Sequence, residues 1–203
     1  MTFSLEKNCI FVHIPKNGGT SMCDTIGVRP GHYKWSTIYN KLIKTNNKGF
    51  WSNAFKFAIV RNPWDRFVSC YEYAKMENSY WHSSSSYSKQ GKHLDFDLLK
   101  NKTFEECVFL YQENKNLFRH QGWQSQYTWI CNENKKIMIS NLFKLEFLNI
   151  QMNKHPFLKQ FSKLQHINKS TRKKDYKPYY NSVTRNIISN AYEKDIELFR
   201  YEF

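Results

Sequence analysis

The 203-residue sequence contains no run of about 18 apolar residues, the length that a membrane-spanning helix needs. Its first residues, MTFSLEKN, lack the cationic and apolar regions of a signal peptide. We therefore expect a soluble, cytoplasmic protein without stable membrane insertion. The five cysteines show no CxxC spacing, and their odd number argues against complete disulfide pairing, so reduced thiols are expected.

Acidic residues are scarce: Asp and Glu number 17 against 31 Lys and Arg, which gives a formal net charge of +14. A balance this basic favours anionic partners, including nucleic acid, phosphate-bearing cofactors, acidic glycans and membrane surfaces. Charge alone does not choose among them. With 203 residues, 40% of them hydrophobic, the chain has the size of one domain with a substantial core, and we expect residues 1–203 to form it.

Three short apolar segments have the composition of buried strands. CIFVHI (9–14) and SNAFKFAIV (52–60) are nearly continuous apolar runs, as in strands that are covered on both faces of a parallel sheet. A third strand is expected in IMISNLF (137–143). Helical segments alternate with these strands, so the sequence predicts an α/β domain with a largely parallel central sheet flanked by helices.

Apolar spacing and capping residues predict the helices. Ser36 is a candidate N-cap, and Thr103 with Glu106 fits a capping box ahead of another helix. A polar, serine-rich segment without periodicity indicates a mobile loop. The expected helices cover 20–27, 36–45, 61–76, 103–117 and 187–199, and the mobile loop is expected over 77–93.

The segment CIFVHIPKNGGTSMCDTIG leads from the first predicted strand through a glycine pair into a helix. Such a loop can aim successive backbone N–H groups at one anion, and the helix N-terminus adds positive potential. Lys16 would bring a mobile positive charge, while Gly18 and Gly19 would allow positive φ and a close approach of the backbone. The lysine precedes the glycines, so the loop departs from the Walker A pattern GxxxxGK[ST], which disfavours a nucleoside triphosphatase. The alternative is an ordinary strand-to-helix turn with a solvated lysine.

A second charged turn follows the next predicted strand, in VRNPWDRFVSCY. Arg61 stands at the strand end, and Ser69 lies about two turns into the helix that follows. Both side chains could reach one phosphate, Arg61 through a bidentate guanidinium and Ser69 through its hydroxyl. The alternative is a capped surface helix in which Arg66 forms a salt bridge.

The two motifs together resemble those of the sulfotransferases that use 3′-phosphoadenosine 5′-phosphosulfate (PAPS), in particular the Golgi-type carbohydrate sulfotransferases and their shorter bacterial relatives. FVHIPKNGGTS resembles the family's 5′-phosphosulfate loop, and FAIVRNPWDRFVSCY resembles its 3′-phosphate motif. The later segments QSQYTWI, LFKLEFL, HINKSTRKKDYKPYY and AYEKDIELFRYEF are also similar, so the resemblance covers essentially the whole chain. It implies a P-loop-like, three-layer domain that transfers a sulfuryl group from PAPS to an acceptor hydroxyl, preferentially of a carbohydrate, without a metal ion.

The resemblance also implies which residues bind the donor. Lys16 would lie near the bridging oxygen of the 5′-phosphosulfate, where negative charge grows as the S–O bond breaks. Asn17 stands where the family commonly has threonine, and asparagine keeps the polarity and tolerates positive φ. The residues expected at the 5′-phosphosulfate are Pro15, Lys16, Asn17, Gly18, Gly19, Thr20 and Ser21, those at the 3′-phosphate are Arg61 and Ser69, and those in a loop closing over the nucleotide are Lys169, Ser170 and Thr171.

In-line transfer also needs a general base for the acceptor proton. We choose His32, in RPGHYKW, because many relatives carry a histidine between the two phosphate motifs, and because a place before a helix N-terminus favours neutral imidazole. A loop histidine or a carboxylate such as Glu72 is the alternative. His13, on the first predicted strand, is expected to be a buried core histidine, while His82 and His93 are expected to be solvated in the serine-rich loop.

Other classes of function compete with this enzyme. A basic nucleic-acid-binding protein would explain the charge and the interspersed aromatic residues, but it leaves both phosphate motifs unexplained. An inactive relative would bind nucleotide without transferring sulfate, and a P-loop kinase would require Mg²⁺ and ATP. We expect a carbohydrate or other hydroxyl acceptor, which the basic charge allows to be anionic, with Trp81 as a candidate platform, and no nucleic-acid partner. The sequence leaves the oligomeric state open, and a Golgi-type chain trimmed of its anchor is the alternative to a cytoplasmic enzyme.

Overall fold

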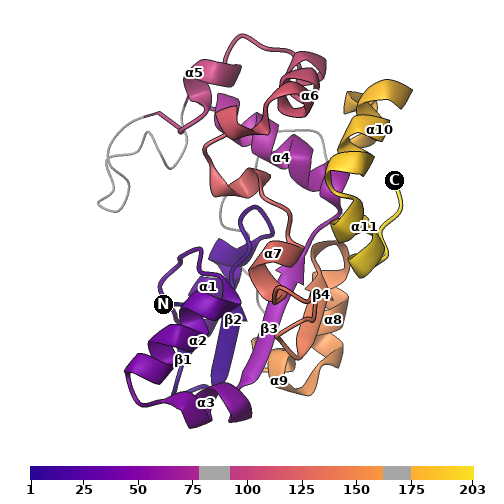
Figure 1. The fold of residues 1–203 in the computed structure, drawn as a ribbon. Helices are drawn as coiled ribbons and strands as arrows, with labels where there is room; N and C mark the ends of the chain where they lie inside the picture. The colour runs from indigo at the N-terminus through magenta and orange to yellow at the C-terminus, as the bar shows by residue number, and fades with distance from the viewer. Residues whose placement is uncertain (78–91, 162–174) are drawn as a thin grey trace. The chain divides into compact units, whose positions relative to one another are not determined.

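The computed structural model describes residues 1–77, 92–161 and 175–203. The chain divides into two compact units, each made of two stretches of sequence (Figure 1). The first unit consists of residues 1–62 and 124–169, and the second of residues 63–123 and 170–203. The expectation of a single domain over the whole chain stays a prediction.

A four-stranded sheet of order β1-β2-β3-β4 forms the centre of the first unit. β1 (Phe3–Ser4) pairs antiparallel with β2 (Cys9–Val12), whereas β2, β3 (Phe55–Val60) and β4 (Asn141–Lys144) are parallel to one another. In this register Val12 lies opposite Ala58, and Val60 lies opposite Lys144. Because parallel strands point the same way, the segments that follow β2, β3 and β4 all leave the same edge of the sheet, where ligands of α/β proteins bind.

Both faces of the central strands are covered. All four residues of β2 are buried, and so are the last four of β3. Successive side chains of a strand point to opposite faces, so a continuous buried run needs a cover on each side. On one face Phe11 and Phe57 stack with 4.9 Å between ring centroids, and side chains from three helices complete the core. These are Met22 and Ile26 of α1 (Gly19–Ile26), Met152 of α8 (Leu148–Lys154) and Leu158 of α9 (Pro156–Lys159). The predicted α/β class with a largely parallel, helix-flanked sheet is confirmed.

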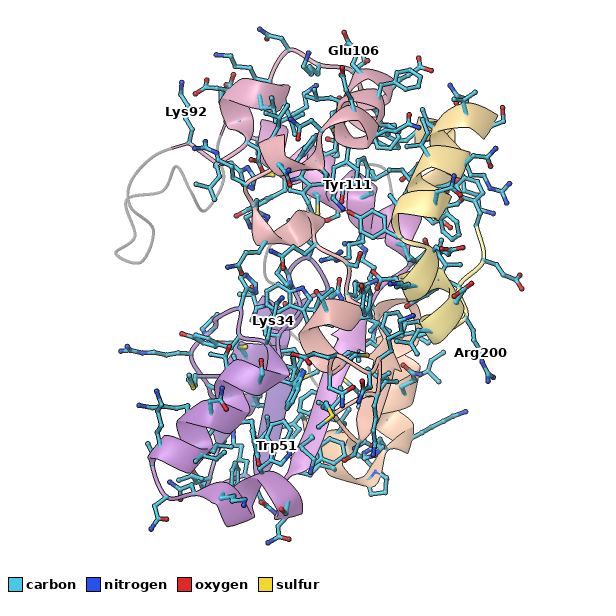
Figure 2. The ribbon with its side chains drawn as sticks, viewed as in Figure 1. Lys34, Trp51, Lys92, Glu106, Tyr111 and Arg200 are labelled. Atoms are coloured by element: carbon cyan, nitrogen blue, oxygen red, sulfur yellow. The ribbon has the colours of Figure 1, made fainter. Side chains whose placement is uncertain are left out.

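Several predicted boundaries in the first unit differ from those of the structure. The second strand starts at Phe55 rather than Ser52, because the residues before it belong to a short helix. Ser36 lies inside a helix whose N-cap is Lys34 (Figure 2), and the Lys34 side chain makes no capping hydrogen bond. Ile137 takes part only in an isolated bridge with Cys131, so the predicted third strand is shortened to β4. The other elements are α2 (Trp35–Lys44), α3 (Lys48–Asn53), α7 (Tyr127–Ile130) and the 3-10 helix η3 (Leu145–Phe147).

An aromatic core holds the second unit together. The hydroxyls of Tyr111 (Figure 2) and Tyr192 both donate to the carbonyl oxygen of Trp123, over 3.0 and 2.7 Å. Phe67 packs edge-on against Trp123, with 5.0 Å between ring centroids. Tyr192 is buried in the same core, and this burial raises the pKa of its hydroxyl well above the usual value. The elements of this unit are α4 (Pro63–Lys75), α5 (Phe96–Leu99), α6 (Phe104–Glu113), α10 (Ser182–Ala191) and α11 (Glu193–Phe199), with 3-10 helices η1 (Lys115–Leu117), η2 (Gln121–Trp123) and η4 (Lys177–Tyr179).

The capping residues of this unit explain where its helices begin and end. The predicted capping box is confirmed: the Thr103 hydroxyl accepts from the Glu106 N–H, and the Glu106 carboxylate accepts from the Thr103 N–H. The helix then ends at Asn114, so the predicted helix over 103–117 is divided into α6 and η1. The single predicted C-terminal helix is likewise divided, at Tyr192, into α10 and α11.

Candidate functional site

The loop that follows β2 has two residues in the left-handed region. Lys16 has φ 69° and Gly18 has φ 73°, and Gly18 is the N-cap of α1. A lysine in this conformation is uncommon and costs free energy, so the surrounding contacts must hold it there. Gly18 makes no side-chain cap for α1, so the first-turn N–H groups of that helix are donors suited to an anion.

The two glycines of the loop have different roles. Gly18 supplies a positive φ, and a Cβ on it would lie 2.9 Å from Cδ1 of Leu145. Gly19 has no positive φ, in contrast to the expectation from sequence. Glycine is required at position 19 for a steric reason, because a Cβ there would lie 2.0 Å from Cδ2 of His13. The second left-handed residue of the loop is Lys16, which sequence reasoning did not anticipate.

Asn17 points into the protein. Its side chain is buried, and its Nδ2 donates to the carbonyl oxygen of Ile59 over 2.8 Å and to Oε1 of Gln126 over 2.7 Å. These bonds tie the loop to the end of β3. Asn17 therefore shapes the loop through its side-chain amide, whereas the positive φ lies one residue earlier, at Lys16.

Arg61 follows β3 directly and reaches the first loop. Its Nη1 donates to the carbonyl oxygen of Lys16 over 2.9 Å, and its side chain is largely buried. The backbone N–H of Arg61 donates to Oε1 of Gln126 over 2.9 Å, and Nε2 of Gln126 donates back to the Arg61 carbonyl over 2.8 Å. The structure thus brings together the cationic residues of both sequence motifs. In the sequence Gln126 belongs to the segment QSQYTWI, which resembles a segment of the family, but no local pattern marks Gln126 as a site residue.

The end of β4 also contributes to this edge of the sheet. Glu146, in η3, accepts a hydrogen bond from the backbone N–H of Asn62 over 2.6 Å. The N–H of Lys144 donates to Oε1 of Gln151 on α8 over 2.9 Å. The segments after β2, β3 and β4 are therefore fixed by side-chain to backbone bonds, which is the kind of preorganisation that an anion site requires.

His13 and His32 form a pair beside the loop. Their ring centroids are 4.3 Å apart, and Nδ1 of the exposed His32 lies 3.3 Å from the carbonyl oxygen of His13. A carbonyl oxygen only accepts, so a hydrogen bond in this contact has Nδ1 of His32 as its donor. Trp129 lies edge-on to the His32 ring, at 6.3 Å between centroids. In a neutral His32 the contact with the His13 carbonyl places the proton on Nδ1 and the lone pair on Nε2, which is the tautomer that a base acting through Nε2 requires.

His13 is buried, as the sequence predicted. Burial, followed by the nearby positive charge that His32 can carry, holds the pKa of His13 well below its usual value. Its Nδ1 contacts Sγ of Cys23 at 3.7 Å, and burial raises the pKa of that thiol to about 12. His13 is therefore neutral at pH 7, and Cys23 is a thiol rather than a thiolate.

Several expected site residues lie in the second unit. Ser69 is a buried residue of α4, so its partnership with Arg61 at one phosphate stays a prediction. The carboxylate of Glu72 accepts from the Tyr179 hydroxyl over 3.0 Å. The expectation of a solvated His93 is wrong: it is buried, and its Nδ1 accepts from the Asp95 N–H over 3.1 Å.

Asp95 explains the burial of this histidine, because its carboxylate organises the segment around it. It accepts from the backbone N–H groups of Arg119 and His120 and from the indole N–H of Trp123. These bonds anchor the residues next to His93 in the interior of the unit. The other expected residues, Trp81, His82, Lys169, Ser170 and Thr171, and most of the 77–93 loop lie outside the described residues.

A model of the sulfotransferase family matches residues 1–202 of the chain. The chain belongs to the sulfotransferase family. Neither a curated protein nor a solved structure matches it. Family membership supports sulfotransferase activity in general, with a sulfate donor and an acceptor substrate.

In residues 1–77, 92–161 and 175–203 of this sulfotransferase, neither a metal-binding cluster nor a membrane-spanning helix is present. Within these ranges no group of three or more His, Cys, Asp and Glu side chains is placed to hold a metal ion. None of the helices described there combines the length and the apolar character needed to cross a bilayer. The candidate site contains lysine, arginine, amide and histidine side chains together with the backbone N–H groups of the first turn of α1.

Proposed function

We propose that the protein transfers the sulfuryl group of PAPS to an acceptor hydroxyl, preferably on a carbohydrate. The observation that carries this proposal is the bond from Nη1 of Arg61 to the Lys16 carbonyl, because it joins the two motifs that resemble phosphate-binding segments. Two cationic side chains at neighbouring strand ends, next to a helix N-terminus, suit a ligand with more than one anionic group. A nucleotide phosphorylated at both its 3′ and 5′ positions has this character.

The 5′-phosphosulfate is assigned to the loop between β2 and α1. The first-turn N–H groups of α1 suit an anion, and Thr20 and Ser21 add hydroxyls that are partly exposed. Lys16 is partly exposed, and its Nζ would stabilise charge on the leaving oxygen. Pro15 and Asn17 are buried and shape the loop, while Gly18 and Gly19 allow its course.

The 3′-phosphate is assigned to Arg61 and Ser69. A guanidinium has five N–H donors in a planar fork, and the bond from Nη1 to Lys16 fixes the direction of that fork. Ser69 is assigned from the sequence motif, as are Lys169, Ser170 and Thr171 in the segment expected to close over the nucleotide. These assignments predict a preference for 3′-phosphoadenosine 5′-phosphate over AMP.

His32 is assigned as the general base. PAPS, when bound, supplies the sulfuryl group and a phosphate leaving group that accepts the electron pair of the broken S–O bond. Nε2 of His32 takes the proton of the acceptor hydroxyl as the new O–S bond forms, and the contact of Nδ1 with the His13 carbonyl maintains the tautomer that does so. His13 is buried and neutral, so it supports this arrangement without placing a positive charge beside the base.

The test is the thermal stabilisation of the protein by 3′-phosphoadenosine 5′-phosphate, compared with AMP and ATP. Ligand at 100 times its Kd should stabilise the wild type by about 2.7 kcal/mol. Lys16→Ala should lose most of this stabilisation, whereas Lys41→Ala, which removes an exposed lysine of α2, should keep it. A wild type that responds equally to all three nucleotides would overturn the donor assignment.

The acceptor class needs its own measurement. Radioactive sulfate transfer from PAPS to a panel of neutral and anionic saccharides, with simple alcohols and phenols as comparison, should label the saccharides first. Selective binding of the nucleotide without transfer to any acceptor would indicate an inactive relative. Steeply salt-dependent binding of oligonucleotides without nucleotide selectivity would indicate a nucleic-acid-binding protein instead.

A further inference from the structure

Gln126 is a fully buried polar residue at the start of α7. Its side-chain amide contacts two of the strand-end segments described above. Oε1 accepts from the Arg61 N–H over 2.9 Å and from Nδ2 of Asn17 over 2.7 Å, and Nε2 donates to the Arg61 carbonyl over 2.8 Å. The amide thus uses both lone pairs of its oxygen as acceptors, and its Nε2 is a donor.

The paired bonds to Arg61 resemble the bonds of a neighbouring strand. Arg61 lies one residue past the end of β3. Gln126 pairs with both the N–H and the carbonyl of Arg61, as a residue of a neighbouring strand would. This fixes the backbone of Arg61 and so the origin of its guanidinium. The third bond fixes Asn17, the residue next to Lys16. A single amide therefore sets the spacing between the two cationic residues.

We propose that Gln126 is a positioning residue for the donor site. It holds Arg61 in the place from which its guanidinium meets the 3′-phosphate, and it holds the loop that carries Lys16 at a matching distance. The proposal rests on the proposed function, since it assumes that Lys16 and Arg61 bind the two ends of one nucleotide. The bonds described above act on the backbone of Arg61 and on the side chain of Asn17, and through these they position the two cationic residues.

The side-chain length and chemistry of glutamine are both required by these contacts. Asparagine is one methylene shorter and would not span to Arg61 and Asn17 together. Glutamate keeps the acceptor oxygen but loses the donor to the Arg61 carbonyl and brings a buried charge. Methionine keeps the volume and removes all three bonds, which makes Gln126→Met the substitution that separates hydrogen bonding from packing.

The test compares affinities for 3′-phosphoadenosine 5′-phosphate and AMP by isothermal titration calorimetry. Gln126→Met should weaken binding of the bisphosphate about 10- to 100-fold, by analogy with the loss of an outer-shell hydrogen-bond partner at a metal site. The affinity for AMP should fall less, so the ratio of the bisphosphate affinity to the AMP affinity should decrease. With PAPS as donor, the KM for PAPS should rise while the KM for the acceptor stays within about twofold.

Two controls separate positioning from general destabilisation. Leu42→Ala removes a buried leucine of α2 and lowers stability, but it should leave the affinity ratio unchanged. In an Arg61→Ala background, Gln126→Met should no longer alter the ratio, because the residue that it positions is gone. A full, additive effect of Gln126→Met in that background would overturn the proposal, and so would a wild-type ratio in the single variant.

Failure of the proposed function is recognised separately. If the wild type shows no preference for the bisphosphate, the donor assignment falls, and hydrogen exchange in the ligand-free protein decides the role of Gln126. Faster exchange of the Arg61 amide and of the loop around Asn17 in Gln126→Met, but not in Leu42→Ala, supports positioning of these segments. Exchange at the wild-type rate in these places would overturn it.

Discussion

The imidazole of His13 occupies the space that a side chain on Gly19 would need. A Cβ at that position would lie 2.0 Å from Cδ2 and 2.3 Å from Nε2 of the ring. The ring has little room to move, since it stacks on Phe11 with 5.6 Å between centroids and contacts Cys23. The glycine at the start of α1 is therefore required by a neighbour from the preceding strand segment, and the backbone conformation of residue 19 itself is ordinary.

Gly19→Ala should destabilise the protein by about 1–3 kcal/mol, the usual cost of overpacking a core position. Gly49→Ala is the matched control, because a Cβ there would have no neighbour within 4 Å and the residue lies in α3. Because Gly49→Ala removes a glycine from a helix, it should stabilise the protein by about 0.5–1 kcal/mol. Urea unfolding measures both, and equal stability of the two variants would contradict the steric account.

His32→Ala should slow sulfuryl transfer by about 10² to 10⁴, the range contributed by a general base. Binding of 3′-phosphoadenosine 5′-phosphate should stay within twofold, since His32 is assigned to the acceptor proton. His155→Gln, which changes a histidine whose Nδ1 accepts from the Phe157 N–H in α9, should transfer at the wild-type rate. Normal turnover in His32→Ala would remove this residue from the mechanism.

The stability of the protein should fall as the pH drops below about 6.5. Burial depresses the pKa of His13 in the folded state, so between that pKa and the unfolded value the unfolded chain binds the extra proton. The stabilisation is complete above the unfolded pKa and is lost on acidification, with a slope of at most about 1.4 kcal/mol per pH unit from this group. His13→Gln should flatten the profile between pH 5 and 7. An unchanged slope in this variant would show that His13 is not the group responsible.

The five cysteines should resist alkylation in the native protein. All five are buried, and burial raises the pKa of Cys23 to about 12 and that of Cys107 above its usual value as well. Iodoacetamide at pH 8 should therefore modify them only as fast as the protein opens, and fully in urea. Mass spectrometry after timed labelling would detect the contrary result, a single cysteine modified rapidly without denaturant.

Much of the sheet could be predicted from the sequence, because its central strands are buried on both faces. The continuous apolar run at Cys9–Val12 has no helical interpretation of comparable strength, and the run ending at Val60 is similar. The two-residue β1 was missed, since such a short strand has no pattern of its own. The boundaries of β4 were also missed, because pairing with β3 rather than local composition determines where that strand begins.

The candidate site divides in the same way. Lys16, Gly18 and Arg61 could be chosen from two local motifs, because each motif joins a strand end to a helix start and carries its own charge. Gln126 could not be chosen, since its role depends on burial against Asn17 and Arg61, residues far away in the sequence. The left-handed φ of Lys16 had no sequence signal either, as glycine rather than lysine is typical of that region.

The sequence by itself determined the α/β class, the family and the identity of the cationic residues at two strand ends, because apolar periodicity and short loop motifs are local properties. Only the tertiary structure decided which of those residues meet, that His93 is buried, and that His32 shares a contact with His13. These outcomes depend on parallel strand register and on side chains from distant segments filling one interior. Burial and hydrogen-bond satisfaction are properties of the whole packed chain, and no short stretch of sequence encodes them.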